Sequence, residues 1–453
     1  METLLFPEAQ LKSREELLFE HSELGRIHAL IPFSELAAPF RKYKPPRHKG
    51  GRRPHLSIEG GLGLMFLKHH LGLSDAMLIQ RLNSDVYLQL FCFTRIALSC
   101  PIRDKDLVGR WRRFFGEHLN IEHLQQIIAQ QVSPVLDHTH VLLDDAVCYE
   151  SEIRYPTDIK LLVECCQWLH RQICKACQFY SLARPRFHQY YAAMERAKAY
   201  QKMKRKPRAK AKRLRVSLLY WVDKWQAVLQ QLLNHSRHYH EVLDERFYTY
   251  LKTIRIVFAQ QSYMLTHNVR RVPHRIVSLA KPYLRPIIRG KERKRYEFGT
   301  KAHISQVDGF NFIEHLSFEA FHEGNRMWYS IAKHKRRFGK CTQYAGDKIY
   351  ATNRNRRKAK KLKLQTCFPR KGPKAKDEKQ RQQARSVLAK ARATRLEGSF
   401  GTEKQHYGLA RIKARNRKTE ITWIFFGVHT ANFVRLARRQ AKKTKSPPSA
   451  RAA

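Results

Sequence analysis

Three carboxylate side chains have the type and the positions needed to bind a metal ion. Asp145 follows an apolar run, Asp347 follows a glycine after a second short run, and Glu397 lies further along the chain. Carboxylate oxygens suit Mg²⁺, which keeps several waters and accepts phosphate oxygens as its remaining ligands. Two such ions could bind both the attacking and the leaving oxygen of a phosphoryl transfer. The three acids therefore predict a site for Mg²⁺, with Mn²⁺ as the alternative ion.

Each of the three acids also has a purely structural interpretation. Asp145 could cap the end of a strand, and Asp347 could occupy a turn. Glu397 could pair with Arg395 or Lys404, which lie nearby in the same predicted helical segment. Spacing along the chain does not decide between metal binding and these local roles.

The strongest global feature is the positive charge. The chain has 88 Lys and Arg against 38 Asp and Glu, a formal net charge of +50. Because like charges destabilise a compact state, a polyanionic partner is expected to neutralise them, and nucleic acid is the favoured one. A membrane surface is disfavoured, since no amphipathic anchor with a large apolar face is found. The apolar stretch at 421–434 is too short to span a bilayer and fits a buried helix better. Without a secretory signal, the chain is expected to be cytoplasmic.

Basic residues also form local runs that could bind a DNA backbone. The run at 202–215, K-M-K-R-K-P-R-A-K-A-K-R-L-R, could be an exposed loop on nucleic acid, a solvated hinge or a nuclear-targeting signal. A second run, R-N-R-R-K, follows Asp347. The candidate DNA contacts in these runs are Lys204, Arg205, Lys206, Arg354, Arg356 and Arg357.

Length and composition indicate a folded protein of two or three domains. The chain has 453 residues, of which 43% are hydrophobic, which is enough to build sizeable cores. Its nine cysteines have irregular spacing, which argues against a disulfide framework. Four of them lie in an apolar pattern with helical spacing, so buried thiols are favoured over a zinc site. These four are Cys165, Cys166, Cys174 and Cys177.

The residues that must position the acids form recognisable elements. The pattern over 56–119 is helical, with Gly72 closing one helix and Ser74 capping the next. A helix-turn-helix reader and a small helical bundle both give this signal. Residues 139–148 read as a central strand, and 159–272 read as helices.

After the helices the periodicity changes to that of strands. Two alternating runs flank Asp308-Gly309, which predicts a two-residue hairpin. Short strands are expected at C-T-Q-Y-A and L-K-L-Q-T-C-F-P. A helix should run from about 377 past 404, with a break considered at Gly398, and a last helix should span 419–439.

Three blocks of sequence resemble the DDE transposases of bacterial insertion sequences. The first is D-A-V-C-Y-E-S-E-I-R-Y-P-T-D, with an aspartate before Y-P-T-D, and the second is G-D-K-I-Y-A-T-N-R-N-R, with an aromatic three residues after its aspartate. The third is R-L-E-G-S-F-G-T-E-K-Q-H-Y-G-L, with glutamate before F-G and a lysine seven residues later. Two further stretches are similar to other parts of these transposases. One resembles their N-terminal helical domain, and the other resembles the segment that precedes their second strand. They are H-L-S-I-E-G-G-L-G-L-M-F-L-K-H-H-L-G-L-S-D and I-I-R-G-K-E-R-K-R-Y-E-F-G-T-K.

Carried over to this chain, the motif register makes Asp145 the first metal ligand. Asp144 should point to the opposite face of the strand. The chain departs from the family at Val147, where a threonine is frequent, and at Ala393, where an arginine of the third block would stand. By resemblance, Arg395 and Lys404 would bind the DNA end.

The resemblance implies a fold class of α+β and α/β type. It is a ribonuclease-H-like mixed sheet with flanking helices, interrupted by a long helical insertion and preceded by an all-helical domain. The implied boundaries are 1–55 for an N-terminal segment and basic linker, 56–135 for a helical DNA-binding domain, 136–158 with 286–438 for the catalytic domain, 159–285 for the insertion, and 439–453 for a disordered basic tail.

The implied function is transposition. The enzyme would bind the terminal inverted repeats of its element, cleave the DNA and transfer the 3′-OH ends to target DNA, with Asp145, Asp347 and Glu397 holding two metal ions. A homo-oligomer on double-stranded DNA in the bacterial cytoplasm is implied as well. Two alternatives remain: a ribonuclease-H-like nuclease without strand transfer, and a non-enzymatic basic protein that binds DNA or RNA.

Overall fold

The computed structural model of the chain contains both helices and strands. The contacts between its residues divide it into two units. The larger, here called the sheet unit, comprises Met1–Ser151, Thr300–Ser317 and Phe321–Ala453. The smaller, the helical unit, comprises Glu152–Gly299 and Phe318–Ala320. The residues described by the structure are 13–46, 55–235, 238–288, 296–373 and 376–445.

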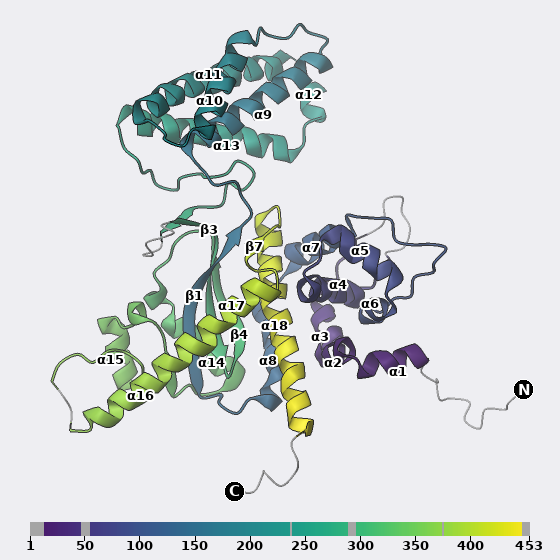
Figure 1. Cartoon of the computed structure of the whole chain (residues 1–453), viewed down its shortest axis with the longest axis vertical. Coiled ribbons are helices and arrows are strands. Elements are labelled where there is room, and N and C mark those ends of the chain that lie inside the picture. The colour runs from purple at the N-terminus through teal and green to yellow at the C-terminus, as the bar shows by residue number, and fades with distance from the viewer. Residues whose placement is uncertain (1–12, 47–54, 236–237, 289–295, 374–375, 446–453) are drawn as a thin grey trace, which may run out of the picture. The chain divides into compact units, whose positions relative to one another are not determined.

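The first part of the sheet unit is helical, and its helix ends follow from local chemistry (Figure 1). Gly72 ends α4 in the left-handed region with φ 64°, and the Ser74 side chain accepts the Met77 N–H at the start of α5. Both boundaries are confirmed as predicted. The elements are α1 (Arg14–His21), α2 (Glu23–Leu30), α3 (Phe33–Ala37), η1 (Ala38–Phe40), α4 (Ile58–Leu71), α5 (Asp75–Ser84), α6 (Val86–Phe91), α7 (Leu107–His118), α8 (Ile121–Val132) and η2 (Ser133–Val135).

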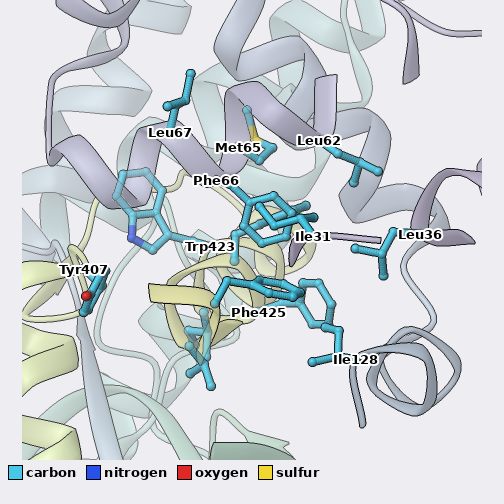
Figure 2. Close-up of a cluster of buried hydrophobic side chains, with 14 of the residues drawn as sticks. Ile31, Leu36, Leu62, Met65, Phe66, Leu67, Ile128, Tyr407, Trp423 and Phe425 are labelled. Carbon is cyan, nitrogen blue, oxygen red and sulfur yellow. The ribbon is translucent and has the colours of Figure 1, made fainter. Parts of the chain in front are cut away.

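These N-terminal helices share one hydrophobic core with the C-terminal helix α18 (Arg417–Lys445). Figure 2 shows part of that core, to which Phe66 of α4 and Phe425 of α18 both contribute. The Phe66 ring also meets the Phe426 ring edge-on, with 5.1 Å between their centroids. The stretch 421–434 is thus part of a buried core helix, as expected. Among the described residues, no helix has the length and apolar character needed to cross a membrane.

The sheet has β1 at its centre, in the strand order β2-β3-β1-β5-β6. Strand β4 pairs with β3 and β7 pairs with β1. Strand β1 runs parallel to β5, with Leu143 opposite Ala345, whereas β3 and β4 are antiparallel. The strands are β1 (Val141–Ser151), β2 (Pro286–Ile288), β3 (Tyr296–Val307), β4 (Phe310–Ser317), β5 (Gln343–Ala345), β6 (Gln365–Thr366) and β7 (Arg411–Ile412).

The hairpin between β3 and β4 turns at Asp308 and Gly309, as predicted. Both residues have positive φ, 47° and 93°, which suits a two-residue turn. Asp308 also accepts a 2.8 Å hydrogen bond from Arg439, and Arg439 donates to the carbonyl of Val135 at 3.1 Å. Because these contacts anchor α18, the helix continues to Lys445. The expected disordered start of the tail at 439 is therefore wrong, and residues 446–453 lie outside the described part.

The segment that carries Glu397 is one long helical stretch with a wide turn inside it. A π-helix, η5, lies between α16 and α17, so the irregularity precedes Glu397 and not Gly398. Helices and short helical turns of this half of the sheet unit are η3 (Glu323–Asn325), α14 (Met327–Phe338), η4 (Lys348–Tyr350), α15 (Asn353–Lys361), α16 (Glu378–Ala391), η5 (Arg392–Leu396), α17 (Glu397–His406) and α18.

Alternate side chains of β1 enter two different cores, as the pleat of a strand requires. Leu142 packs in a small cluster with Met327 of α14 and Tyr344 of β5. Leu143 and Val147 belong to the large core that also holds residues of α17 and α18. The sheet is therefore covered on both faces, and neighbouring residues of β1 face different helices.

The helical unit consists of α9 (Asp158–Phe179), α10 (His188–Lys202), α11 (Arg208–His235), α12 (His238–Glu241) and α13 (Glu245–Thr266), together with β2 and the first residues of β3. All four predicted cysteines are free thiols on α9. Cys165, Cys166 and Cys177 are buried as predicted, whereas Cys174 is only partly buried. The basic run at 202–215 is only partly a loop, because α11 begins at Arg208.

Candidate functional site

Asp145 lies on β1 at the point where the strand meets η5. Its Oδ1 accepts the Ala146 N–H at 2.8 Å, and its Oδ2 lies 2.5 Å from the nearest guanidinium nitrogen of Arg392. The side chain is only 15% exposed. Burial raises the pKa of Asp145 to about 6, although the charge of Arg392 acts in the opposite direction. Further upward shifts come from the negative charges of Glu323 and Glu397.

The neighbouring acid, Asp144, faces the other core. Its Oδ2 accepts a 3.1 Å hydrogen bond from the Tyr344 hydroxyl and lies 3.7 Å from a ring nitrogen of His303. Complete burial, followed by the charge of Glu314, holds the pKa of Asp144 well above its usual value. Adjacent acids of one strand therefore have different surroundings, as alternation along the strand predicts.

Asp347 lies two residues beyond the end of β5, the strand that runs parallel to β1. Leu143 of β1 pairs with Ala345 of β5. Asp145 follows Leu143 by two residues, and Asp347 follows Ala345 by two residues. The intervening Gly346 is required by close packing, since a Cβ there would lie 2.9 Å from the Tyr344 hydroxyl oxygen. Asp347 is exposed, and its Oδ1 accepts the Lys348 N–H at 2.6 Å.

Glu397 begins α17, and one of its oxygens lies 3.0 Å from the same Arg392 nitrogen that binds Asp145. Burial alone would lower the pKa of Arg392. The charges of Asp145, Glu397 and Asp347 outweigh that effect and raise it. The negative charges of all three predicted acids therefore act on Arg392, and Arg392 forms ion pairs with Asp145 and Glu397.

The donor set has the chemistry of a site for hard divalent cations. All three predicted ligands offer carboxylate oxygens, the type that Mg²⁺ and Mn²⁺ prefer. Their present spacing is set by Arg392, and among the described residues no three His, Cys, Asp or Glu side chains are close enough together to hold a metal ion. Asp145 and Glu397 both contact Arg392, whereas Asp347 is exposed just beyond β5.

Comparison with known families matches two parts of the chain. Residues 344–433 match the model described as Transposase DDE domain, and residues 12–114 match the one described as Transposase domain (DUF772). The chain is an insertion-sequence DDE transposase. Membership implies DNA binding and the use of divalent metal ions. A search of curated proteins and a search of solved structures gave no significant match.

The two matches cover different parts of the sheet unit of the transposase. The DDE model includes the positions of Asp347 and Glu397, and it ends before most of the basic residues at the end of α18. The other model covers α1 to most of α7. Asp145 lies in neither range, so its place in the site rests on its contact with Arg392 and on the register of β1.

Sequence reasoning missed two residues at this site, Arg392 and Glu323. Glu323 lies in η3 and forms an ion pair with Lys301, with 2.7 Å between the charged atoms. Its negative charge adds to the rise in the pKa of Asp145 that burial causes. No local pattern distinguishes it. Arg392 lies five residues before Glu397, whereas the arginine of the family motif would lie four residues before it. The π-helix brings Arg392 into contact with Glu397 despite this extra residue.

The predicted DNA-end residues flank Glu397 but differ in their surroundings. Arg395 is exposed in η5, with its backbone carbonyl accepting from Gln306 at 3.4 Å. Lys404 lies further along α17, where its charge partly opposes the rise that burial causes in the pKa of the neighbouring Glu403. The ion pair of Glu397 observed in the transposase is with Arg392. The ion pairs of Glu397 with Arg395 or Lys404 that the sequence suggested are therefore not supported.

The remaining predicted DNA contacts divide between the two units. In the sheet unit, Arg354 and Arg357 are exposed on α15. Arg356 is committed to the structure, since it donates to the carbonyls of Ala351 at 2.9 Å and Pro369 at 2.6 Å. In the helical unit, the three basic residues at 204–206 are exposed in the loop between α10 and α11.

A second acid of α17, Glu403, lies behind the candidate site. Its carboxylate accepts a 2.5 Å hydrogen bond from the Tyr149 hydroxyl and a 2.6 Å hydrogen bond from Asn311. Complete burial raises the pKa of Glu403 to about 7. The same residue lines a cavity of about 360 Å³, whose rim includes Arg435 and Arg438.

Proposed function

We propose that this transposase cleaves DNA at the ends of its own element and joins the freed 3′-OH ends to target DNA, using Mg²⁺ held by Asp145, Asp347 and Glu397. The observation that carries the proposal is the meeting of Asp145 and Glu397 at one guanidinium nitrogen, at 2.5 and 3.0 Å. Acids so distant in sequence, gathered in so basic a chain, are expected where cations bind.

A ribonuclease-H-like core is proposed for the sheet. Three features support it: the first strand is central, an antiparallel hairpin lies on one side, and two parallel strands lie on the other. The first two acids come after equivalent positions of two adjacent parallel strands. The residue ranges proposed for the catalytic domain, 136–158 and 286–438, contain all of these strands.

The proposed chemistry assigns separate roles to the residues. Asp145, Asp347 and Glu397 would hold the divalent ions and position charge, and none of them would act as a nucleophile. Bound there, the ions would stabilise the attacking and leaving oxygens of the phosphodiester. Gly346 allows the chain to pass close to the Tyr344 and Tyr350 side chains, and Asp347 follows it at the end of a strand that pairs with β1, the strand of Asp145.

DNA binding is proposed to combine a general grip with local reading of bases. The high density of Lys and Arg supplies contacts to phosphates that weaken as salt rises. The exposed Arg354 and Arg357 of α15 and the loop at 204–206 are candidates for such contacts. Recognition of the terminal repeats would need base contacts, which we assign to the helices within 56–119.

The proposal is tested with a plasmid that carries the DNA flanking the coding region at both ends. Asp145→Asn, Asp347→Asn and Glu397→Gln should each abolish Mg²⁺-dependent cleavage while DNA binding by gel shift is kept. Asp377→Asn, which removes an exposed carboxylate before α16, is the matched control and should cleave normally. Cleavage at the wild-type rate by any of the first three variants would refute its assignment as a ligand.

Two further measurements separate metal binding from other roles of the acids. Asp145→Cys should lose activity with Mg²⁺ and regain part of it with Mn²⁺, because a thiolate is a softer ligand than a carboxylate. A strand-transfer assay should detect junctions between element ends and target DNA. Cleavage without such junctions would favour a nuclease, and DNA binding in EDTA without cleavage under any condition would favour a non-enzymatic binding protein.

A further inference from the structure

Arg392 occupies the point between two of the proposed metal ligands. A single nitrogen of its guanidinium lies 2.5 Å from Asp145 Oδ2 and 3.0 Å from Glu397 Oε1. The side chain is 16% exposed, about as little as the 15% of Asp145. A positive group in this position neutralises two carboxylates that would otherwise repel each other in a partly buried site.

The backbone of η5 creates this contact. The Glu397 N–H bonds to the carbonyl of Arg392, five residues earlier, instead of the carbonyl four residues earlier. In a regular α-helix of about 3.6 residues per turn, residues five apart point in different directions. The wider π turn brings them to the same side, and such turns are frequent at functional sites. The extra residue thus positions Arg392 over Glu397.

A divalent cation needs the same oxygen atoms that Arg392 binds. The guanidinium and the metal ion are both positive, so they would also repel each other at this distance. Metal binding and the present position of Arg392 are therefore mutually exclusive at the shared oxygens of Asp145 and Glu397.

We infer that Arg392 is a residue that controls metal access: in the metal-free protein it holds Asp145 and Glu397 together, and it must leave them before a divalent ion binds. The inference rests on the proposed function. A released guanidinium is well suited to bind a phosphate of the DNA backbone with two parallel hydrogen bonds. DNA binding would then favour metal binding, and by linkage metal would favour DNA binding to the same degree.

The test is Mn²⁺ binding to the full-length, metal-free protein, followed by the electron paramagnetic resonance signal of free Mn²⁺. Without DNA, Arg392→Gln should bind Mn²⁺ at least tenfold more tightly than wild type. Lys390→Gln removes the same charge from an exposed position at the end of the adjoining helix α16 and should stay within twofold of wild type. This control separates release of the carboxylates from a general loss of positive charge.

A second measurement adds DNA, and its result for the wild-type protein does not depend on how the variant folds. A short DNA duplex should tighten Mn²⁺ binding by wild type and have little effect on Arg392→Gln. Equal Mn²⁺ affinity in wild type and Arg392→Gln, or weaker binding by the variant, would overturn the inference. Mn²⁺ binding that survives in an Asp145→Asn, Glu397→Gln double variant would instead refute the proposed metal site.

Discussion

The buried carboxyl of Glu403 offers a test of the local electrostatics that the structure assigns to α17. Burial raises its pKa to about 7 from an ordinary value of 4.5. Glu403→Gln keeps the size of the side chain and can still accept from Asn311, while the Tyr149 hydroxyl can turn to accept from the new amide. The variant therefore removes the titration and keeps most of the packing.

The direction of the pH effect follows from proton binding. The folded protein keeps the Glu403 proton up to about pH 7, whereas the unfolded chain releases it near pH 4.5. Between these values the folded state binds more protons, so the stability of the wild type falls as the pH rises. The contribution is fully present below pH 4.5 and is lost as the pH passes about 7. Linkage gives a loss of roughly 2.5 kcal/mol between pH 5 and pH 8, relative to Glu403→Gln.

Urea unfolding of the two proteins at several pH values measures this loss directly. The difference in free energy of unfolding should favour Glu403→Gln increasingly as the pH rises, with most of the change between pH 5 and pH 8. Glu117→Gln, at an exposed position of α7, controls for the loss of one negative charge. Parallel curves for wild type and Glu403→Gln would mean that the carboxyl is ionised throughout, and the argument from burial would be wrong.

Other expectations follow from the packing and from the charge. Gly61→Ala should destabilise the protein by about 2–3 kcal/mol in urea unfolding, because its Cβ would lie 2.4 Å from the Trp111 ring; an unchanged midpoint would contradict this packing. Ser74→Ala should cost about 1 kcal/mol by loss of the cap on the Met77 N–H, and Ser74→Asp should restore it. Replacing the three basic residues at 204–206 by Gln should lower the slope of log affinity against log salt by about 2–3 for duplex DNA; an unchanged slope would remove this loop from the DNA interface.

Several local features could be read from the sequence because their causes are local. Gly72 ends α4 in a left-handed conformation, and Asp308-Gly309 turns the hairpin, because both depend on a few neighbouring backbone angles. The facing of Asp144 and Asp145 follows from the alternation of a strand in the same way. A family resemblance in three motif blocks was enough to identify a DDE transposase.

Other features depend on distances that no local pattern encodes. The first helices were expected to form a separate domain, yet Phe66 packs against residues of α18 near the other end of the chain. The start of the tail was placed too early, because the contact of Arg439 with Asp308 extends α18. These interactions join residues far apart in sequence, and their energy is gained only after the chain has folded.

For the candidate site, the sequence alone determined which side chains can offer carboxylate oxygens and how much positive charge surrounds them. The tertiary structure decided which atoms meet. Pairing of β1 with β5 sets Asp145 and Asp347 two residues beyond the paired residues Leu143 and Ala345. One extra residue in a helical turn sets Arg392 on both Asp145 and Glu397. The reason is physical: chemical type is a property of each residue, whereas strand register and helix phase are fixed by backbone hydrogen bonds formed across the whole fold.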